Sequence, residues 1–391
     1  TPWGTISWKK LHEKAASILA RLKVTLPLDV PVKHLAPGEQ AMVAIARAFA
    51  ESASIYCMDE PTTSLTDHEK NTLFAVIRNL QSLGATVIYV SHDLDDVMAL
   101  TDRVTIMRDS KVVGTWNTEA LSKDEIISKM IGRDITSAFP PKTATIRAVV
   151  LSISGLSSAK VRDISFELHA GEILGIAGLL GSGRTELLRT IYGIDRITQG
   201  SLILQGHEFH PTSPKNSIQK GIVLVPEERR SQGLLLQRSI YENISLVYLD
   251  ELSTGPFLNR SVERREAEHI GRSVNLKAAD YRYHVSTLSG GNQQKVVFAK
   301  SLLRQPVVLL LDEPTKGVDV GARFEIYSVV QEMAARGTAV LLVSSDFPEL
   351  LGLADRILVL CDGQQARIVE NRDLEQETLL TYCYGTENIS Q

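Results

Sequence analysis

The sequence predicts an α/β fold with a mostly parallel sheet core, arranged as a tandem repeat. Two observations carry this prediction: short runs of Val, Ile and Leu alternate with amphipathic stretches, and several motifs recur at one constant offset. Near-continuous apolar runs are typical of strands buried on both faces of a parallel sheet, and the stretches between them supply the crossover helices. We therefore expect two related α/β domains.

The apolar runs place the expected strands in chain order. They lie at residues 54–58, 85–90, 173–180, 222–225, 307–311 and 339–343. Ahead of the first strand, apolar residues from Leu11 to Leu22 follow helical spacing and predict one amphipathic helix. The stretch 135–147 has no periodicity and contains Phe139-Pro140-Pro141, so we expect an interdomain linker there.

The repeat has an offset of 253 residues and no gap. Asp59-Glu60-Pro61-Thr62 returns at residues 312–315, and three further short matches keep the same offset. They pair residues 35–40 with 288–293, 91–93 with 344–346, and 102–103 with 355–356. We expect the first copy at 1–134 and the second, complete copy at 148–391. The glycine-rich loop of the second copy has its counterpart before Thr1, so we expect an N-terminally truncated first copy.

Composition and charge exclude several classes of protein. The 391 residues carry 42 Lys and Arg against 46 Asp and Glu, and a net charge of −4 gives no general reason to expect nucleic acid as a partner. The three cysteines are too few for a disulfide framework. Neither an apolar stretch of about 18 residues nor a basic-then-apolar leader is present, so we expect a soluble cytoplasmic protein.

A phosphate-binding loop is expected at residues 178–185, between a strand and a helical stretch. The pattern is G-x-x-x-x-G-[K]-[ST] with Arg184 at the lysine position. Glycines let backbone N–H groups surround phosphate oxygens, and Thr185 is a candidate Mg²⁺ ligand. Because arginine is bulkier and planar, we expect nucleotide binding with impaired catalysis. The candidate binding residues are Gly178, Gly181, Ser182, Gly183, Arg184 and Thr185.

Paired carboxylates follow a buried strand in both copies. They are Asp59-Glu60 in the first copy and Asp312-Glu313 in the second. The carboxyl ends of parallel strands are where ligands bind in an open α/β sheet. There an aspartate can reach Mg²⁺ through water, and the adjacent glutamate can polarise an attacking water. We therefore expect Glu60 and Glu313 to be catalytic and both aspartates to serve the metal.

A histidine follows the next strand of the first copy. Its neutral imidazole can contact a γ-phosphate and the attacking water, so His92 is a third candidate catalytic residue. The second copy carries Ser345 at this position, and a hydroxyl cannot do the same.

A further anion-binding helix start is expected in each copy. In the second copy, residues 288–292 read Leu-Ser-Gly-Gly-Asn and precede a helical stretch. The first copy has lost the serine hydroxyl and one glycine, since residues 35–39 read Leu-Ala-Pro-Gly-Glu. The candidate residues of these loops are Leu35, Gly38, Ser289, Gly290, Gly291 and Gln293.

In this order the motifs resemble the nucleotide-binding domains of ABC transporters, which are P-loop ATPases with a helical signature subdomain. G-L-x-G-S-G-R-T, P-E-x-R, L-S-G-G-N-Q-Q-K and D-E-P-T-x-G-V-D are similar to the ATP-binding subunits of bacterial monosaccharide importers of the ribose, galactose, arabinose and xylose type. The resemblance implies that Glu227 contacts nucleotide, where most such domains carry glutamine. It also makes Asp319 the D-loop aspartate, with Thr66 at the same place in the first copy.

The resemblance implies ATP and Mg²⁺ as cofactors, and ATP hydrolysis coupled to sugar translocation. In this family each ATP lies between the phosphate loop of one domain and the signature loop of another, in the same chain or in a second one. One site then combines residues 178–185 with the altered loop 35–40, and we expect it to hold ATP. The other uses Asp59, Glu60 and His92 with residues 289–291 and Asp319. We expect the full-length protein to hydrolyse ATP mainly there, although the phosphate loop of this site is the one missing from the first copy.

The implied partners are permease subunits and, through them, a periplasmic sugar-binding protein, but no nucleic acid. The expected location is the cytoplasmic face of the bacterial inner membrane, as a peripheral protein. A permease helix is expected near residues 227–249, unless apolar residues such as Leu234 and Ile240 are subdomain core.

Three alternatives stay open. The first is a non-transport ABC ATPase of translation or repair, although no basic arm or coiled-coil insertion is seen. The second is a truncated, non-catalytic remnant that binds only nucleotide or permease, and this chain alone is expected to bind ATP weakly and to hydrolyse it slowly. The third is an importer of a nucleoside or a signalling sugar, because the ATP-binding subunit does not touch the cargo.

Overall fold

The computed structural model describes residues 6–50, 53–62, 65, 67–91, 93–108, 111–131, 139–254 and 257–384. Its internal contacts divide the chain into two units, Thr1–Asp134 and Ile135–Gln391, which we describe separately. None of the helices in the described stretches combines the length and the apolar character that a bilayer crossing requires.

The second unit is built on a central sheet that is parallel except at one edge. The strand order in the described residues is β10 (Ile222–Val225), β13 (Val308–Asp312), β14 (Ala339–Val343), β7 (Ile173–Ala177), β15 (Arg356–Cys361) and β16 (Gln364–Glu370). Only β16 runs antiparallel, against β15. Every residue of β7, β13 and β14 is buried, as expected for strands covered on both faces. This confirms the predicted parallel core; β7 ends at Ala177 because the glycine-rich loop begins there.

A smaller antiparallel sheet covers one side of the central sheet. Its strand order is β6 (Ile164–His169), β5 (Val149–Ser157), β8 (Gln199–Leu204) and β9 (His207–Glu208). Leu151, Leu168 and Leu202 of this sheet share an apolar cluster with Leu188 of α6 (Arg184–Ile191). Helix α6 is thereby held between the two sheets, with its N-terminus at the end of β7.

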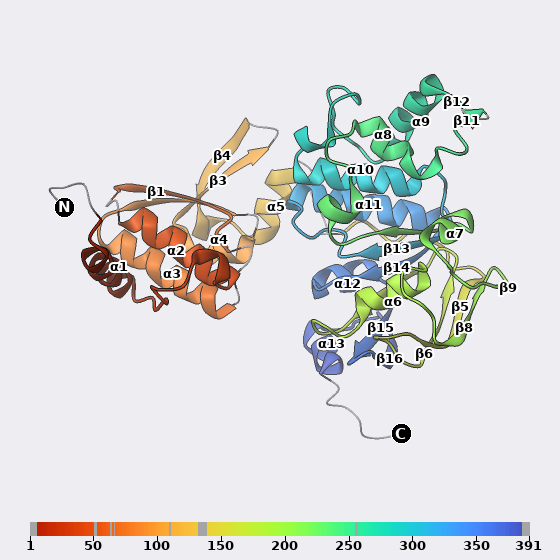
Figure 1. Ribbon diagram of the computed structural model, residues 1–391, viewed down its shortest axis with the longest axis horizontal. Helices are drawn as coiled ribbons and strands as arrows, with labels where there is room; N and C mark the ends of the chain where they lie inside the picture. The colour runs from red at the N-terminus through yellow and green to blue at the C-terminus, as the bar shows by residue number, and fades with distance from the viewer. Residues whose placement is uncertain are drawn as a thin grey trace. The chain divides into compact units, whose positions relative to one another are not determined.

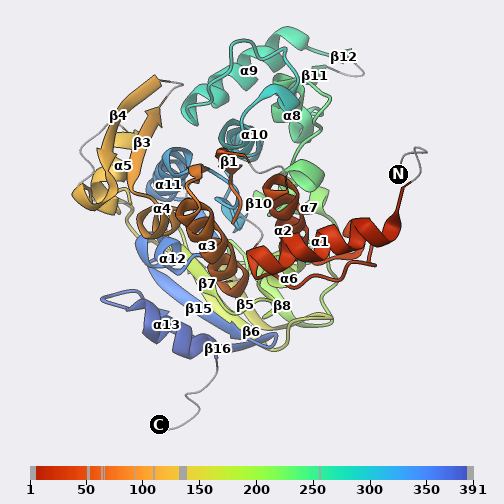
Figure 2. The same cartoon turned by 90° about the vertical axis from the view of Figure 1, so that its left-hand side faces the viewer.

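A helical layer covers the other side, as predicted for the signature subdomain. It consists of α8 (Ile240–Ser245), α9 (Arg260–Ser273) and α10 (Gly290–Leu302), which gather above the central strands in Figure 1. Val296, Phe298 and Ile244 of this layer join the apolar cluster that also contains Leu309 and Leu311 of β13. The other α-helices and strands described for this unit are α7 (Pro214–Gln219), β11 (Ser253–Thr254), β12 (Phe257–Leu258), α11 (Val320–Ala335), α12 (Phe347–Leu353) and α13 (Gln376–Cys383). Helix α13 lies beside β15 and β16 in Figures 1 and 2.

The stretch expected as a linker is described from Phe139 onward, and there it packs on the second unit. The Phe139 ring stacks on Tyr327 of α11, with 5.3 Å between the ring centroids. Lys142 donates to the Ala354 carbonyl and lies 3.7 Å from the Asp355 carboxylate. Residues 139–147 are therefore anchored to the surface of this unit by one aromatic and one charged side chain.

In its described residues, the first unit has two α-helices before its first strand, and a parallel strand pair. Its elements are α1 (Trp8–Leu22), α2 (Pro37–Phe49), β1 (Ile55–Asp59), α3 (Asp67–Ser82), β2 (Thr86–Val90), α4 (Leu94–Leu100), β3 (Arg103–Arg108), β4 (Lys111–Asn117) and α5 (Lys123–Ile131). The helix expected between Leu11 and Leu22 is confirmed as α1. Helices α2 and α3 cover one face of the β1–β2 pair through Phe49, Val76 and Tyr56.

The repeat is reproduced element by element. Shifting α2, β1, α3, β2, α4, β3 and β4 by 253 residues gives the bounds of α10, β13, α11, β14, α12, β15 and β16. The register irregularity between Ile106 and Met107 returns between Val359 and Leu360. Burial differs: Ile55 is 58% exposed, whereas its counterpart Val308, in the cluster around α6, is 0% exposed.

Candidate functional site

The predicted phosphate-binding loop of the second unit joins the buried strand β7 to the start of α6. Its turns need glycine, because the φ angles are +83° at Gly181 and +95° at Gly183. Gly178 leaves no room for a side chain, since a Cβ there would lie 2.3 Å from the Ser182 hydroxyl and 2.6 Å from the Leu360 carbonyl. The loop is thus tightly wound against the sheet, which is the arrangement that directs backbone N–H groups toward an anion.

Thr185 and Asp312 are brought together although they are 127 residues apart in the chain. The Thr185 hydroxyl donates to Asp312 Oδ1 at 3.2 Å. Burial and, to a lesser degree, the nearby carboxylates of Glu227 and Glu313 raise the pKa of Asp312 to about 6, although the hydrogen bond from Thr185 opposes the rise. A buried carboxylate crowded by two others gains from a cation beside it, and hydroxyl and carboxylate oxygens are ligands that suit Mg²⁺. The two residues therefore fit the metal expected from the sequence.

Arg184 turns from the start of α6 toward the strand ends rather than into solvent. Its guanidinium donates to the Ser344 carbonyl at 2.8 Å and lies 3.7 Å from Glu313 Oε1. The side chain is only 9% exposed. A cation thus sits between the glycine-rich loop and the ends of β13 and β14.

The two glutamates that follow the strands have the same unusual backbone in both units. The φ angles are +47° at Glu313 and +49° at Glu60, in the left-handed region that non-glycine residues rarely adopt. Each backbone N–H is bound by the end of the next strand: Glu313 to the Val343 carbonyl at 3.0 Å, and Glu60 to the Val90 carbonyl at 2.9 Å. Two independent copies therefore hold this residue in one strained conformation.

The residue facing the glutamate differs between the copies. In the second unit, the Ser345 hydroxyl donates to Glu313 Oε2 at 3.0 Å. Its counterpart in the first copy, His92, lies outside the described residues, as does Thr66. Asp59 is the last residue of β1, so Asp59 and Glu60 occupy the same positions on their strand as Asp312 and Glu313 do on β13.

The loops predicted as signature loops lie at the starts of α10 and α2. Ser289 is the N-cap of α10 and accepts from the Asn292 amide group, whereas Ala36 at the start of α2 has no hydroxyl to do so. In both copies a glutamine side chain closes the loop: Gln293 donates to the Leu288 carbonyl at 3.1 Å, and Gln40 to the Leu35 carbonyl at 2.9 Å. The altered first loop thus keeps its fold but has lost a surface hydrogen-bonding group.

Glycines of these loops face the helix that follows the carboxylates. A Cβ on Gly291 would lie 2.7 Å from the Ala322 Cβ and 3.2 Å from Asp319 Oδ2. Asp319 itself is the N-cap of α11 and accepts from the Ala322 N–H at 2.9 Å. In the first copy the neighbour of Gly38 is the Glu69 carboxylate, which occupies the space that a Cβ would need.

The second unit thus gathers the predicted residues in two groups. Arg184, Thr185, Asp312 and Glu313 meet at the end of β7, β13 and β14, while Ser289, Gly290, Gly291 and Asp319 meet where α10 and α11 begin. Glu227, predicted to contact nucleotide, is paired with Lys316, with 2.6 Å between Oε1 and Nζ.

Sequence reasoning missed a buried contact that both units share. The Thr315 hydroxyl donates to Glu349, and 253 residues earlier the Thr62 hydroxyl donates to Asp96. The signal was available, because an acidic residue recurs at positions 96 and 349 with the offset of the repeat.

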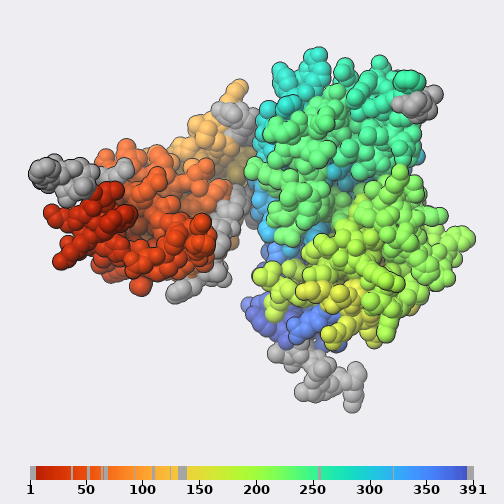
Figure 3. Space-filling view, in the orientation of Figure 1, coloured from red at the N-terminus to blue at the C-terminus, as the bar shows by residue number. Residues whose placement is uncertain are grey.

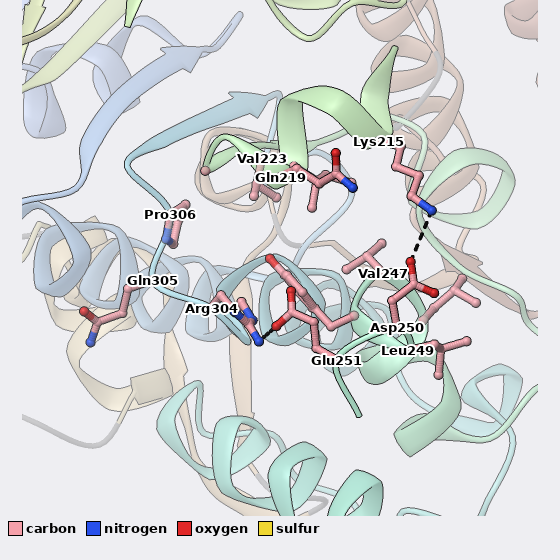
Figure 4. A pocket seen from close by; sticks show the side chains of 14 residues that line it. Lys215, Gln219, Val223, Val247, Leu249, Asp250, Glu251, Arg304, Gln305 and Pro306 are labelled. Carbon is pink, nitrogen blue, oxygen red and sulfur yellow. Dashed lines mark hydrogen bonds and ion pairs between the residues drawn. The ribbon is translucent and has the colours of Figure 1, made fainter. Parts of the chain in front are cut away.

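A cavity of about 600 Å³ opens between α7, β10 and the turn after α8 (Figure 4). Its wall is apolar where Val223, Val247 and Pro306 line it, and its rim is charged. Two ion pairs cross the rim: Lys215 with Asp250 at 3.1 Å, and Arg304 with Glu251. The green part of the chain, which contains residues 215–250, forms much of the face of this unit turned to the viewer in Figure 3.

The apolar residues predicted to meet a partner near this cavity divide into two kinds. Leu234 and Ile240 are 7% and 0% exposed and belong to the apolar core of the helical layer. Leu235 is 48% exposed, and residues 246–249 line the cavity. The surface available to a partner therefore includes Leu235 and the cavity-lining residues 246–249, but not Leu234 or Ile240.

Comparison with known proteins gives concordant results. The profile of the ABC transporter family matches residues 3–63 and 161–316. The galactose/methyl galactoside import ATP-binding protein MglA of Clostridium tetani is 40% identical over 97% of this chain and 76% of its own length. The ribose import ATP-binding protein RbsA of Geobacillus kaustophilus is 40% identical over 98% of this chain and 78% of its own length.

Solved structures resemble the chain in fold. A nucleotide-free ATP-binding cassette from an ABC transporter aligns with a TM-score of 0.54 at 20% identity, over 62% of this chain and all of that one. A cassette dimer in a post-hydrolysis state, bound to ADP and phosphate, aligns with a TM-score of 0.51 at 22% identity, over 57% of this chain and all of its own.

Proposed function

This chain belongs to the ABC transporter family, and we propose that it is the ATP-hydrolysing subunit that powers import of a monosaccharide through a membrane permease. The observation that carries the proposal is the meeting of Thr185 and Asp312 beside the glycine-rich loop, at the carboxyl end of a parallel sheet. The ribose and galactose named in the 40% identical relatives support a monosaccharide as the cargo.

The glycine-rich loop binds the phosphates of ATP in this proposal. Backbone N–H groups at the start of α6 face the anion, and Arg184 supplies a positive charge within reach of Glu313. Thr185 and Asp312 hold Mg²⁺, which neutralises phosphate charge when it is bound. Because Asp312 is 3% exposed, its interaction with a cation is little screened by water.

Glu313 and Glu60 are the proposed acceptors of a proton from the attacking water. Their strained backbone fixes the carboxylate at the strand end, where it need not reorganise during the reaction. In the second unit the Ser345 hydroxyl donates to Glu313, and a hydroxyl cannot replace a histidine that contacts the γ-phosphate and the attacking water. We therefore assign most of the hydrolysis to Glu60 with His92, and ATP retention to the loop that contains Arg184.

The cavity beside α7 is the proposed docking site for a cytoplasmic helix of the permease. Its apolar wall suits the apolar side of a helix, and the paired charges of its rim can exchange partners with a docking segment. The location that follows is the cytoplasmic face of the membrane. A second nucleotide-binding domain, in this chain or in another, and a periplasmic sugar-binding protein complete the proposed assembly.

Uptake measurements test the proposal. The gene is deleted in its source organism, and ATP-dependent uptake of labelled ribose, galactose, arabinose, xylose and a nucleoside is compared with cells that carry the wild-type gene or the Asp312→Asn variant. We expect uptake of at least one monosaccharide to depend on the wild-type gene and to fall at least tenfold with the variant. Dependence of nucleoside uptake alone, or of none of the cargoes, contradicts the proposal.

A further inference from the structure

One arginine of the second unit binds two successive backbone carbonyls. Arg229 opens the single helical turn Arg229–Gly233 that follows β10. Its two terminal nitrogens donate to the Lys316 carbonyl at 2.8 Å and to the Gly317 carbonyl at 3.0 Å. Both carbonyls lie between Glu313 at the strand end and Asp319 at the start of α11, so the arginine holds the connection between two predicted site residues.

The same connection reaches back to the arginine's own loop. Lys316 Nζ lies 2.6 Å from Glu227 Oε1, two residues before Arg229. The segments 227–229 and 316–317 are thus joined by two side chains: Arg229 binds the carbonyls of Lys316 and Gly317, and the Lys316 side chain binds Glu227. We call these four residues, Glu227, Arg229, Lys316 and Gly317, the clasp.

The geometry of the clasp requires arginine and glycine. Gly317 has a φ of +63°, which turns its carbonyl together with that of Lys316 toward one guanidinium. A lysine at position 229 lacks the planar pair of nitrogens that donate separately to the two carbonyls here. The Nε–H of Arg229 is buried and has no hydrogen-bond partner in the described residues, so the two carbonyl bonds are those that fix the guanidinium.

Gly290 of the signature loop lies next to two residues of the clasp, Arg229 and Gly317. A Cβ on Gly290, the first residue of α10, would lie 3.0 Å from a terminal nitrogen of Arg229 and 3.5 Å from the Gly317 carbonyl. The next residue, Gly291, is in contact with the start of α11. The N-terminus of α10 is therefore seated against the guanidinium on one side and α11 on the other.

We propose that Arg229 is a positioning residue that fixes the signature loop and the Asp319 turn to the segment after β10. Because the contacts of Arg229 hold these three segments together, a displacement of residues 227–229 moves Ser289 and Asp319 as well. Strand β10 also contributes Val223 to the wall of the cavity beside α7. The clasp is thus the connection through which docking of a permease is transmitted to the signature loop, a role that rests on the proposed function.

Hydrogen–deuterium exchange of the purified chain tests the seating itself. Arg229→Gln should speed amide exchange at least tenfold in peptides 289–296 and 315–320 and leave peptide 178–187 unchanged. Lys316→Met, which removes only the side-chain bridge, should give a smaller increase in the same peptides. The control is Arg238→Gln, since that arginine is exposed and its nearest pairing, to Glu242, is 3.9 Å long. Unchanged exchange in both peptides of Arg229→Gln overturns the proposal.

Hydrolysis measurements in the permease complex test the role. Arg229→Gln should lower kcat at least tenfold and change KM for ATP less than threefold, because the phosphate-binding loop is untouched. Gly290→Ala, which crowds the guanidinium, should have the same effect, and the double variant should be no worse than either single one. An additive double variant, or a loss carried by KM, overturns the proposal. If wild-type hydrolysis does not respond to permease, the proposed function fails, whereas the exchange experiment still decides the seating.

Discussion

The hydroxyl of Thr315 donates a hydrogen bond to the buried carboxylate of Glu349, with 2.8 Å between Oγ1 and Oε1. The contact joins the loop after Glu313 to α12, the helix that follows Ser345. In the first unit Thr62 and Asp96 make the same contact at 2.7 Å. Tyr89 of β2 also donates to Asp96 there, at 3.2 Å. Both copies keep this hydrogen bond although its surroundings differ between them. We therefore infer that the loop after Glu313, and the equivalent loop after Glu60, require it.

The free energy of unfolding should depend on pH through Glu349, with a sign set by the direction of its pKa shift. Burial raises the pKa of Glu349 from 4.5 to about 7, although bonds from Ser344 and Thr315 oppose the shift. The native state holds this proton more tightly than the unfolded chain, so the free energy of unfolding falls as pH rises from about 4.5 to about 7. The loss is on the order of 3 kcal/mol and is complete above that window.

Glu349→Gln should remove this dependence, because an amide cannot ionise and still accepts from Thr315. Urea unfolding of variant and wild type between pH 5 and about 8 measures the difference, and the variant should gain relative stability as pH rises. Glu332→Gln, an exposed residue paired with Arg336, is the control and should follow wild type. Parallel curves for Glu349→Gln and wild type contradict the assignment.

The two glutamates proposed as catalytic, Glu60 and Glu313, should not contribute equally to ATP hydrolysis. Glu60→Gln should lower ATP hydrolysis by the assembled transporter roughly 100-fold, the effect typical of losing a general base. Glu313→Gln should leave most of the activity, because Ser345 rather than a histidine faces Glu313. Steady-state hydrolysis at saturating ATP measures both. Intact activity in Glu60→Gln together with its loss in Glu313→Gln reverses the assignment.

Arg184 should contribute to ATP binding through its charge. Arg184→Ala removes the cation near Glu313 and should weaken ATP binding at least tenfold, whereas Arg184→Lys should keep most of the affinity. Arg189→Ala is the matched control, because that arginine lies on the same helix and pairs with Asp195 on the surface. Fluorescence titration with a nucleotide analogue measures all three. Equal affinity in Arg184→Ala and wild type argues against the role.

A charge in the cavity wall should disturb docking and nothing else. Val247→Arg places a cation among the apolar residues of the cavity and should reduce copurification with the permease at least fivefold. Ile194→Arg, on the exposed loop after α6, is the control for an added charge elsewhere. ATP binding should be unchanged in both variants. Normal copurification of Val247→Arg rejects the cavity as the docking site.

The sequence was sufficient for the parallel strands β1, β2, β7, β10, β13 and β14 and for the repeat, since these follow from local apolar runs and short motifs, but it did not indicate the antiparallel sheet β6–β5–β8–β9. It did not reveal how long side chains connect distant segments. The pairing of Glu227 with Lys316 and the two bonds of Arg229 depend on three loops meeting in space. The anchoring of Phe139 on Tyr327 was missed for a related reason, because a proline-containing stretch without periodicity carries no local sign of the surface it packs on.

Binding of ATP to the purified chain, with and without Mg²⁺, tests the central claim most directly. The claim is that Thr185 and Asp312 hold the metal beside the phosphate-binding loop. Thr185→Ala should weaken ATP binding at least tenfold in Mg²⁺ and leave it unchanged in EDTA, while Thr198→Ala, an exposed threonine, should match wild type in both. Equal affinity of Thr185→Ala and wild type in Mg²⁺, or ATP binding that ignores Mg²⁺ in wild type, would contradict the account.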